Sequence, residues 1–132
     1  MDRKNLFKLI GLLVFFIFVV SIFANKFYWY YSIWYFDIIM HTLSGFWVGL
    51  VAVYLFTSET LPSHPLWKML FFVLVIGFGW EVFEFLFNNY IAQNSFDFVD
   101  SASDIVFDLI GGLCAILYLL VPFKNQRTGD KE

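Results

Sequence analysis

Four long apolar runs, separated by short polar or aromatic segments, dominate the hydrophobic pattern of the chain. Each run has about the 20 residues that an α-helix needs to cross the hydrocarbon core of a bilayer. Helices are predicted for all four, because in lipid only a helix satisfies its own backbone hydrogen bonds, and no alternation typical of β-strands competes. The predicted spans are residues 6–24, 38–56, 69–87 and 104–121.

This pattern predicts an all-α, polytopic membrane protein with a four-transmembrane-helix bundle. Residues 1–123 would form one transmembrane domain, with Pro122 ending the last span, and residues 124–132 a polar cytoplasmic tail. The aromatic segment FYWYYSIWYF (27–36) lies between the first two runs. Because aromatic side chains favour the membrane interface, we expect this first outer loop to lie in the headgroup plane as a short interfacial helix.

Composition excludes a soluble globular protein. The chain is 61% hydrophobic and 14% charged, with a mean hydropathy of +0.75, whereas soluble domains are roughly 25% charged. The lipid bilayer is therefore the expected environment, and no nucleic-acid partner is expected. The single cysteine, Cys114, excludes a disulfide within one chain. The oligomeric state is left open.

Lysine and arginine are distributed unevenly over the predicted loops. The first loop has only Lys26, and the third loop has none. By the positive-inside rule, both termini and the loop over residues 57–68 lie in the cytoplasm, so we expect a multi-pass protein of the inner (cytoplasmic) membrane. The basic residues on the cytoplasmic side are Arg3, Lys4, Lys8, Lys68, Lys124, Arg127 and Lys131.

Ionisable side chains recur at one depth of the predicted bundle, near its outer surface. The second and fourth spans enter from outside and the third exits outward, so three helices carry polar pairs in the same layer. The pairs are Asp37 with His41, Glu81 with Glu84, and Asp104 with Asp108. Their spacing of three or four residues places both members of a pair on one helix face.

The acids of this layer have no basic partner in the sequence, because residues 69–123 contain six acids and no lysine or arginine. An ionised carboxylate at mid-bilayer costs roughly 2.5–3.5 kcal/mol on insertion scales. The acids must therefore bind cations, hold protons or line a water-filled cavity. A divalent metal ion (Mg, Mn, Ca or Zn) is the cofactor that suits an oxygen-rich set with one imidazole. The predicted ligands are Asp37, His41, Glu81, Glu84, Asp104 and Asp108.

Some of these residues also have a purely structural interpretation. Asp37, Asp100 and Asp104 fall at predicted helix starts, where aspartate is a favoured N-cap. Glu81, Glu84 and Asp108 lie inside spans and are not explained as caps, which favours a functional role. Asp100 is expected at the rim of the site or as a cap, and Ser44 as a hydrogen-bond donor to a ligand. Close helix packing is predicted at Gly45, Gly49, Gly77, Gly79, Gly111 and Gly112.

Three short motifs resemble those of the uncharacterised YjdF-like inner-membrane proteins. They are YFDIIMHTLSGFWVG, WEVFEF and DSASDIVFDLIGG. The resemblance implies that the polar signature of that family includes Asp37, His41, Glu81, Glu84, Asp100 and Asp104. Asp108 departs from the pattern, so its assignment depends on the charge argument alone. More distantly, E-x-x-E followed by D-x-x-x-D-x-x-G is similar to a VanZ-like motif, although the basic residue before the aspartate of that family is absent.

Three classes of function remain open. The first is a metal-dependent hydrolase or transferase acting on a lipid headgroup or isoprenoid phosphate at the outer leaflet, with Glu81 or Glu84 as the catalytic general base. The second is a cation- or proton-coupled binding or transport protein. The third is a small scaffold subunit whose acids bind a basic partner. The spans are apolar below the acidic layer, which favours a one-sided pocket over a passage. Whether the protein is an enzyme is left open.

Overall fold

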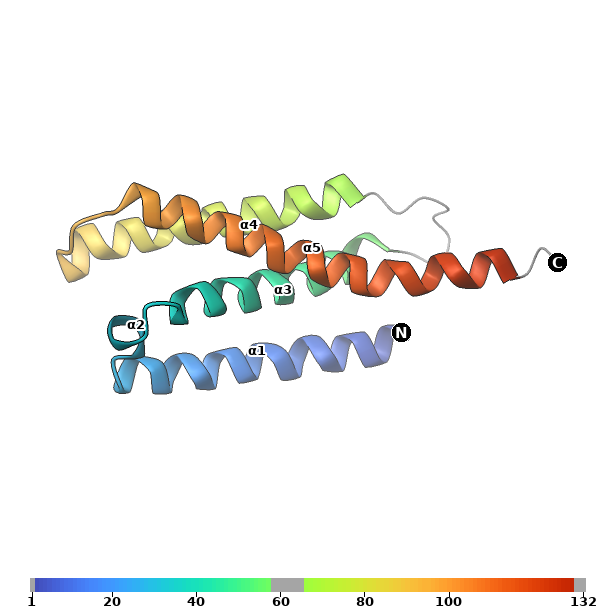
Figure 1. The fold of residues 1–132 in the computed structure, drawn as a ribbon, viewed down its shortest axis with the longest axis horizontal. Coiled ribbons are helices and arrows are strands. Elements are labelled where there is room, and N and C mark those ends of the chain that lie inside the picture. The colour runs from blue at the N-terminus through green and yellow to red at the C-terminus, as the bar shows by residue number, and fades with distance from the viewer. Residues whose placement is uncertain (1, 58–65, 130–132) are drawn as a thin grey trace.

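Four long helices form the protein in the computed structural model, which describes residues 2–57 and 66–129, with side chains up to residue 120. All four are long and apolar enough to cross a membrane. The predicted all-α four-helix bundle is therefore confirmed, and so is a short helix in the first loop. The elements are α1 (Arg3–Lys26), α2 (Trp29–Ser32), α3 (Phe36–Phe56), α4 (Leu66–Phe87), the π-helical η1 (Asn88–Ala92) and α5 (Phe98–Gly129) (Figure 1).

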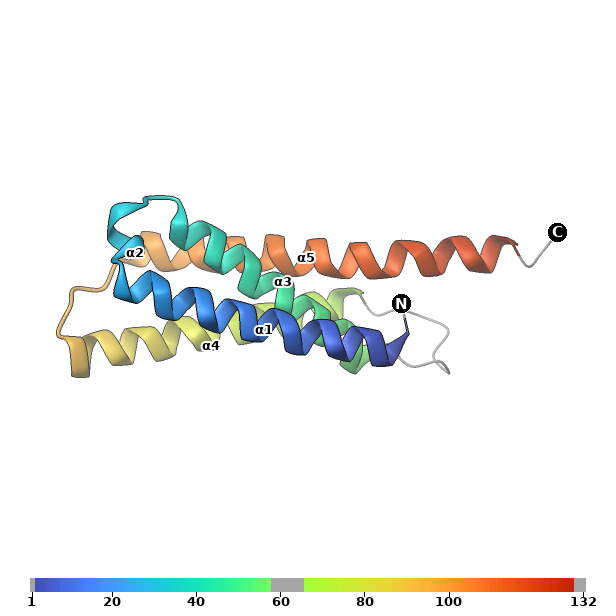
Figure 2. The same cartoon turned by 90° about the horizontal axis from the view of Figure 1, so that it is seen from below.

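The helices run up and down, so that the start of α1 and the end of α5 lie at one end of the bundle and α2 and η1 at the other (Figures 1 and 2). Helix α5 packs most extensively on α3 and also contacts α4. Among the described residues, α1 packs on α3 and α2 but not on α4 or α5. The centre of the bundle is thus made by α3, α4 and α5.

The helices extend beyond the apolar runs that predict them. Helix α5 begins at Phe98 rather than at residue 104, because the Asp97 carboxylate caps it by accepting hydrogen bonds from the backbone N–H groups of Val99 (2.9 Å) and Asp100 (3.3 Å). Its helical backbone also continues to Gly129, into the segment expected to be a tail. Pro122 removes one backbone donor but does not end the helix.

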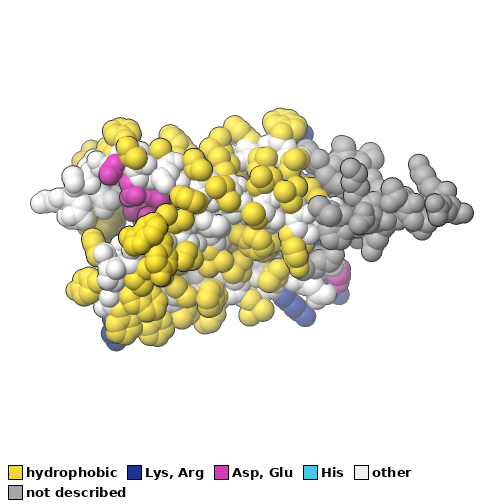
Figure 3. Space-filling model, viewed as in Figure 1, with side chains coloured by type: hydrophobic (Ala, Val, Ile, Leu, Met, Phe, Trp, Pro, Cys, Tyr) yellow, Lys and Arg dark blue, Asp and Glu magenta, His cyan; other side chains and the backbone are white. Residues whose placement is uncertain are grey.

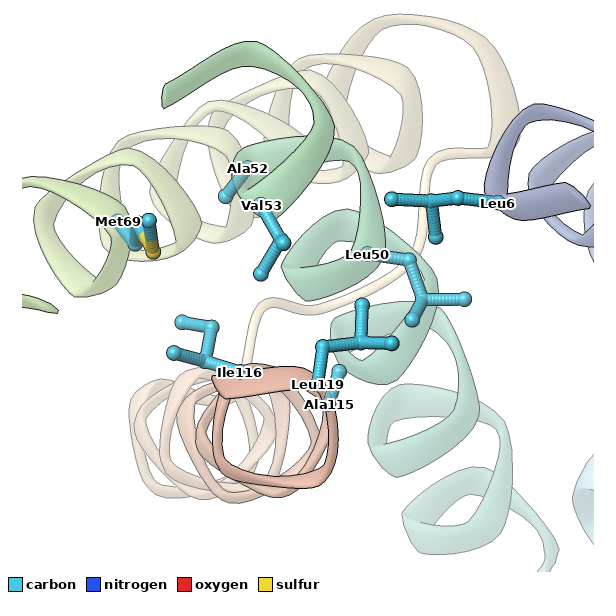
Figure 4. Packing of buried hydrophobic residues seen from close by; sticks show 8 residues of the cluster. All are labelled: Leu6, Leu50, Ala52, Val53, Met69, Ala115, Ile116 and Leu119. Atoms are coloured by element: carbon cyan, nitrogen blue, oxygen red, sulfur yellow. The ribbon is translucent and has the colours of Figure 1, made fainter. Parts of the chain in front are cut away.

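A cluster of buried apolar side chains fills the half of the bundle nearest the termini (Figure 4). Large apolar side chains also face outward, with Phe15 of α1 66% exposed and Phe78 of α4 59% exposed, and they cover much of the visible surface (Figure 3). Apolar residues on both sides of a helix are expected where the solvent is lipid. The buried cluster consists of Leu6, Leu50, Ala52, Val53, Met69, Ala115, Ile116 and Leu119.

Glycines bring the backbones of α3 and α5 into direct contact. A Cβ atom at Gly45 would collide with the backbone oxygen of Asp108, and one at Gly111 with the backbone oxygen of Thr42. The predicted close packing is therefore present at this crossing. Gly79 differs from the prediction, because a Cβ there would meet nothing within 4 Å. It lies on the outward face of α4, which helical spacing alone does not reveal.

Candidate functional site

The acidic layer lies at the end of the bundle that carries α2 and η1, where acidic side chains show at the surface in Figure 3. The first turns of α3 and α5 and the last turns of α4 meet there, since α4 runs opposite to the other two (Figure 1). The cluster defined here as the carboxylate–histidine cluster comprises Asp37, His41, Glu81, Glu84, Asp104 and Asp108.

His41 occupies the centre of this cluster and has a carboxylate on each side of its ring. Its Nδ1 lies 3.2 Å from Oδ1 of Asp108. Its Nε2 lies 3.5 Å from Oδ2 of Asp104 and 3.7 Å from Oδ1 of Asp37. With the ring proton on Nδ1, the imidazole donates a hydrogen bond to Asp108 and directs the Nε2 lone pair toward Asp37 and Asp104.

His41 belongs to two groups of residues whose ligand atoms lie close enough to share a metal ion. The first group is Asp37, His41 and Asp104, and the second is His41, Glu81 and Glu84. Within each group, one ligand atom from each residue lies within 4.8 Å of the others. Two ligands on opposite sides of a cation are separated by roughly twice a metal–oxygen bond of about 2.0–2.6 Å. The spacing of both groups therefore suits coordination of one ion.

Most of the cluster is shielded from solvent. His41, Glu81, Asp104 and Asp108 are each less than 10% exposed, whereas the Asp37 side chain is 34% exposed. Among residues 2–57 and 66–120, no lysine or arginine forms an ion pair with a carboxylate of the cluster. The imidazole of His41 is thus the one basic side chain found among these acids.

The Glu81 carboxylate lacks a hydrogen-bond partner at one of its oxygens. Its Oε1 atom is buried and has no hydrogen-bond partner among the described residues, although Ser101 of α5 approaches the carboxyl group. A buried polar atom without a partner costs about 1–3 kcal/mol, and more if it is charged. A proton or a cation would satisfy this oxygen. Glu84, one turn further along α4, is more exposed than Glu81.

A stripe of buried residues along α4 directs Glu81 into the bundle. Its buried residues are Met69, Val73, Gly77 and Glu81, each four positions after the last. Four-residue spacing keeps side chains on one helix face. The stripe is apolar at the end nearest the termini and becomes acidic at the site, so the face that packs the bundle is also the face that carries the carboxylate.

Two further residues near the cluster were missed in the sequence. Tyr30 of α2 lies over Phe36, with ring centroids 5.0 Å apart. Burial raises the pKa of its phenol, a hydrogen bond with Ser21 of α1 lowers it in part, and the nearby charges of Asp37 and Glu84 raise it. The phenol therefore lies near the charges of the cluster, while its hydroxyl is hydrogen-bonded to α1. No spacing signal distinguishes Tyr30 from the other aromatic residues of its segment. Ser101, by contrast, precedes Asp104 by three residues and shares its face.

The structure brings together all six predicted ligands, five in the two groups and Asp108 through its contact with His41. The other two predicted site residues lie outside both groups. Asp100 is exposed in the first turn of α5, beside the capping residue Asp97. Ser44 is half-buried on α3.

Comparison with known proteins identifies the family of the chain. A family model described as "Predicted membrane protein (DUF2238)" matches residues 2–125, a range that includes the whole carboxylate–histidine cluster. No curated protein and no solved structure matches the chain. With four candidate spans and a match over nearly its full length, the chain is a multi-pass membrane protein that belongs to this DUF2238 family.

Proposed function

We propose that the protein binds a divalent cation in the carboxylate–histidine cluster and uses it to act on a phosphate ester of a lipid headgroup or an isoprenoid. The observation that carries this proposal is that His41 is shared by two groups of potential ligands, each with ligand atoms within 4.8 Å. Carboxylates and imidazole are ligands for Mg²⁺, Mn²⁺, Ca²⁺ and Zn²⁺.

The charge balance of the cluster supports a bound cation. Five carboxylates surround a single imidazole, and residues 69–120 contain no lysine or arginine. Like charges held close together in a medium of low dielectric constant repel strongly. A divalent ion would neutralise two of these charges, and it would also supply the partner that Oε1 of Glu81 lacks.

The geometry around the ring supports different roles for the three aspartates. Asp37 and Asp104 face Nε2 of His41 and are proposed as ligands with it. Asp108 faces Nδ1 and is proposed as a positioning residue, which holds the ring in the orientation that frees Nε2. Carboxylates that orient ligating histidines in this way are common in metal sites. This departs from the sequence-based hypothesis, in which Asp108 is itself a ligand.

Glu81 and Glu84 are proposed to do the acid–base chemistry. A bound cation would polarise a phosphoryl oxygen and neutralise its charge. In other phosphate sites, arginine or lysine side chains neutralise this charge. Glu84, the more exposed of the two, could accept the proton of an attacking water molecule or alcohol. Water as the nucleophile would give a hydrolase, and an alcohol would give a transferase. In either case a new bond forms to phosphorus and the P–O bond to the leaving oxygen breaks. That oxygen belongs to the lipid alcohol of a monophosphate or to the inner phosphate of a diphosphate. Glu81 is proposed to give it a proton.

A transport function is less well supported by the packing. Towards the termini, the cluster gives way to the buried apolar side chains shown in Figure 4. The backbones of α3 and α5 also touch at Gly45 and Gly111. An ion path would need polar groups to continue inward. The described residues therefore favour a pocket that opens at one end.

We also propose that the site faces the outer leaflet of the inner membrane, on the positive-inside argument, and that the YjdF-like proteins belong with this family. The first proposal depends on the concentration of lysine and arginine at the terminal end of the bundle. The second depends on the three motifs, which contain all six cluster residues.

Metal binding is tested by elemental analysis of the detergent-purified protein, dialysed against each of the four cations. About one bound ion per chain is expected for the parent and for Glu84→Gln, and loss of the ion for the ligand variants Asp104→Asn and His41→Gln. Asp2→Asn, which removes an exposed carboxylate at the opposite end of the bundle, is the matched control and should bind as the parent does. Ion contents of Asp104→Asn and His41→Gln equal to that of the parent would contradict the assignment.

The reaction is tested separately with the metal-loaded protein in mixed micelles. Release of phosphate from a lipid phosphate or an isoprenoid diphosphate is followed by ³¹P NMR, and Glu84→Gln should abolish it. Binding of the ion without turnover of either substrate would retain the metal site and reject the enzyme.

A further inference from the structure

A second polar feature lies at the opposite end of the bundle, where α1 begins and α3 ends. A shallow cavity of about 370 Å³, open to the surface, is present there. It is lined by two helices, with the first two turns of α1 on one side and Tyr54 of α3 on the other. The lining residues are Arg3, Lys4, Phe7, Lys8 and Tyr54.

Arg3 is held in place at the seam between these helices. Its Nη1 donates a hydrogen bond to the backbone oxygen of Thr57 at 2.7 Å. Its guanidinium carbon lies 4.4 Å from the centre of the Tyr54 ring, a cation–π contact. The hydrogen bond to Thr57 uses one of the five N–H donors of the guanidinium. An ordered arginine of this kind is suited to recognise a phosphate oxygen.

Two lysines add to the positive charge of the cavity. Lys4 and Lys8 are four residues apart and share a helix face. Within residues 2–57 and 66–120, none of the three cations forms an ion pair with a carboxylate. Three positive charges therefore line one cavity, and no carboxylate of the described residues, the adjacent Asp2 included, is within ion-pair distance of them.

The remaining wall of the cavity is apolar and continues onto the surface of α1. Phe7 is 63% exposed and packs against Tyr54 with ring centroids 5.9 Å apart. Further along the helix, Leu12 is 68% exposed and Phe15 66% exposed. A ligand in the cavity would thus meet cations at the end of the helix and a hydrophobic surface directly beneath them.

We propose that this cavity binds the headgroup of an anionic glycerophospholipid. The phosphate would lie among Arg3, Lys4 and Lys8, and the acyl chains would run along the exposed apolar face of α1. Basic pockets at the membrane surface are recognised sites for acidic lipid headgroups. The apolar wall favours a lipid over a soluble phosphate, because acyl chains would cover the exposed face of Phe7, which a soluble ion would leave uncovered. The site is separate from the carboxylate–histidine cluster and does not depend on its function.

The proposal is tested by titrating the delipidated protein in a neutral detergent with phosphatidylglycerol or with phosphatidylcholine of the same acyl chains. Binding is followed by native mass spectrometry and by the shift in melting temperature. Phosphatidylglycerol is expected to bind in preference to phosphatidylcholine. Each basic residue near an acidic surface contributes enough attraction that Lys4→Gln and Lys8→Gln should each weaken phosphatidylglycerol binding about five-fold.

Three controls distinguish the proposed site from a general attraction of charges. Lys26→Gln removes a cation from the other end of α1 and should leave binding unchanged, while Lys8→Arg should retain it. Equal binding of the two lipids, or equal losses in Lys8→Gln and Lys26→Gln, would overturn the proposal. If inorganic phosphate raised the melting temperature as much as phosphatidylglycerol does, the cavity would be a site for soluble anions and the lipid assignment would be wrong.

Discussion

Gly77 of α4 lies directly against the carboxylate of Asp108 on α5, so that a Cβ atom at position 77 would stand 2.8 Å from Oδ2 of Asp108. The same carboxylate contacts Nδ1 of His41 through its other oxygen, at 3.2 Å. The missing side chain of Gly77 thus provides the space in which Asp108 can hold the imidazole. A residue without any polar side-chain atom helps to orient the centre of the cluster.

Gly77→Ala should therefore weaken metal binding without removing a ligand. The added methyl group must displace the Asp108 carboxylate, and loss of a group that orients a ligand typically costs about 10–100-fold in metal affinity. Gly79→Ala is the matched control on the same helix, because a Cβ there meets nothing within 4 Å. Isothermal titration with the preferred cation measures both. Equal affinities for the two variants would show that Asp108 tolerates the displacement.

Asp108→Asn should have a similar effect on affinity with little effect on the fold. The amide keeps the size of the carboxylate but is a weaker acceptor for the Nδ1–H of His41, so the ring is less firmly oriented. A drop of about 10–100-fold is expected, against complete loss for His41→Gln. Asp100→Asn, an exposed change on the same helix, should bind as the parent does. A complete loss of the ion in Asp108→Asn would instead make Asp108 a ligand.

Gly111→Ala should destabilise the bundle, although position 111 carries no charge. Its Cβ would collide with the backbone oxygen of Thr42, and backbone cannot move aside as a flexible side chain can. Overpacking of this kind costs about 1–3 kcal/mol. Unfolding in mixed detergent micelles measures the loss. Gly11→Ala on α1, where nothing lies within 4 Å, should leave the free energy of unfolding unchanged or slightly raise it. If both variants unfold alike, α3 and α5 are further apart than described.

Trp47→Phe should loosen the attachment of α1. The indole Nε1 of Trp47 donates a hydrogen bond to the backbone oxygen of Ile10 at 3.0 Å, and side-chain hydrogen bonds between membrane helices contribute about 0.6 kcal/mol on average. Trp80→Phe is the control, since Trp80 is 54% exposed. Unfolding in mixed micelles should show a loss of this size for Trp47→Phe alone. Equal effects would mean that the hydrogen bond contributes nothing beyond the volume of the ring.

Reporter fusions should place both termini in the cytoplasm and Asn94 outside. The structure puts the start of α1 and the end of α5 at one end of the bundle, opposite η1 and the segment that follows it (Figure 1), and the lysine and arginine distribution sets the direction. A fusion at Ser63, which is outside the described residues, should also report cytoplasm. A periplasmic C-terminus would reverse the orientation and put the carboxylate–histidine cluster on the cytoplasmic side.

The four helices and the common depth of the acids follow from the sequence because both depend on periodicity and length alone. The start of α5 does not, since Asp97 caps the helix in a segment too polar to join the apolar run. A capping aspartate followed by Phe98 and Val99 is a local signal that hydropathy averages out. Helix ends near the interface are accordingly predicted less well than helix centres.

The division of roles within the cluster also lies beyond the sequence. Spacing places Asp104 and Asp108 on one face of α5, but it does not say which of them meets which nitrogen of His41. That depends on the angle and height at which α3 crosses α5, and these are set by the backbone contacts at Gly45 and Gly111. Glycine positions indicate in general where helices approach closely, but they do not settle each case: a Cβ at Gly79 would meet nothing within 4 Å.

Asp108 makes two separate contacts: its backbone oxygen packs against Gly45, and its carboxylate lies beside His41. The contact with Gly45 at the helix crossing uses only the main chain of residue 108. Every amino acid except proline presents nearly the same main chain there. Exchanges of the side chain at position 108 can therefore retune the site while the crossing is inherited unchanged. Evolution of a new ligand preference in this scaffold could begin at this residue without first finding a new way to pack the helices.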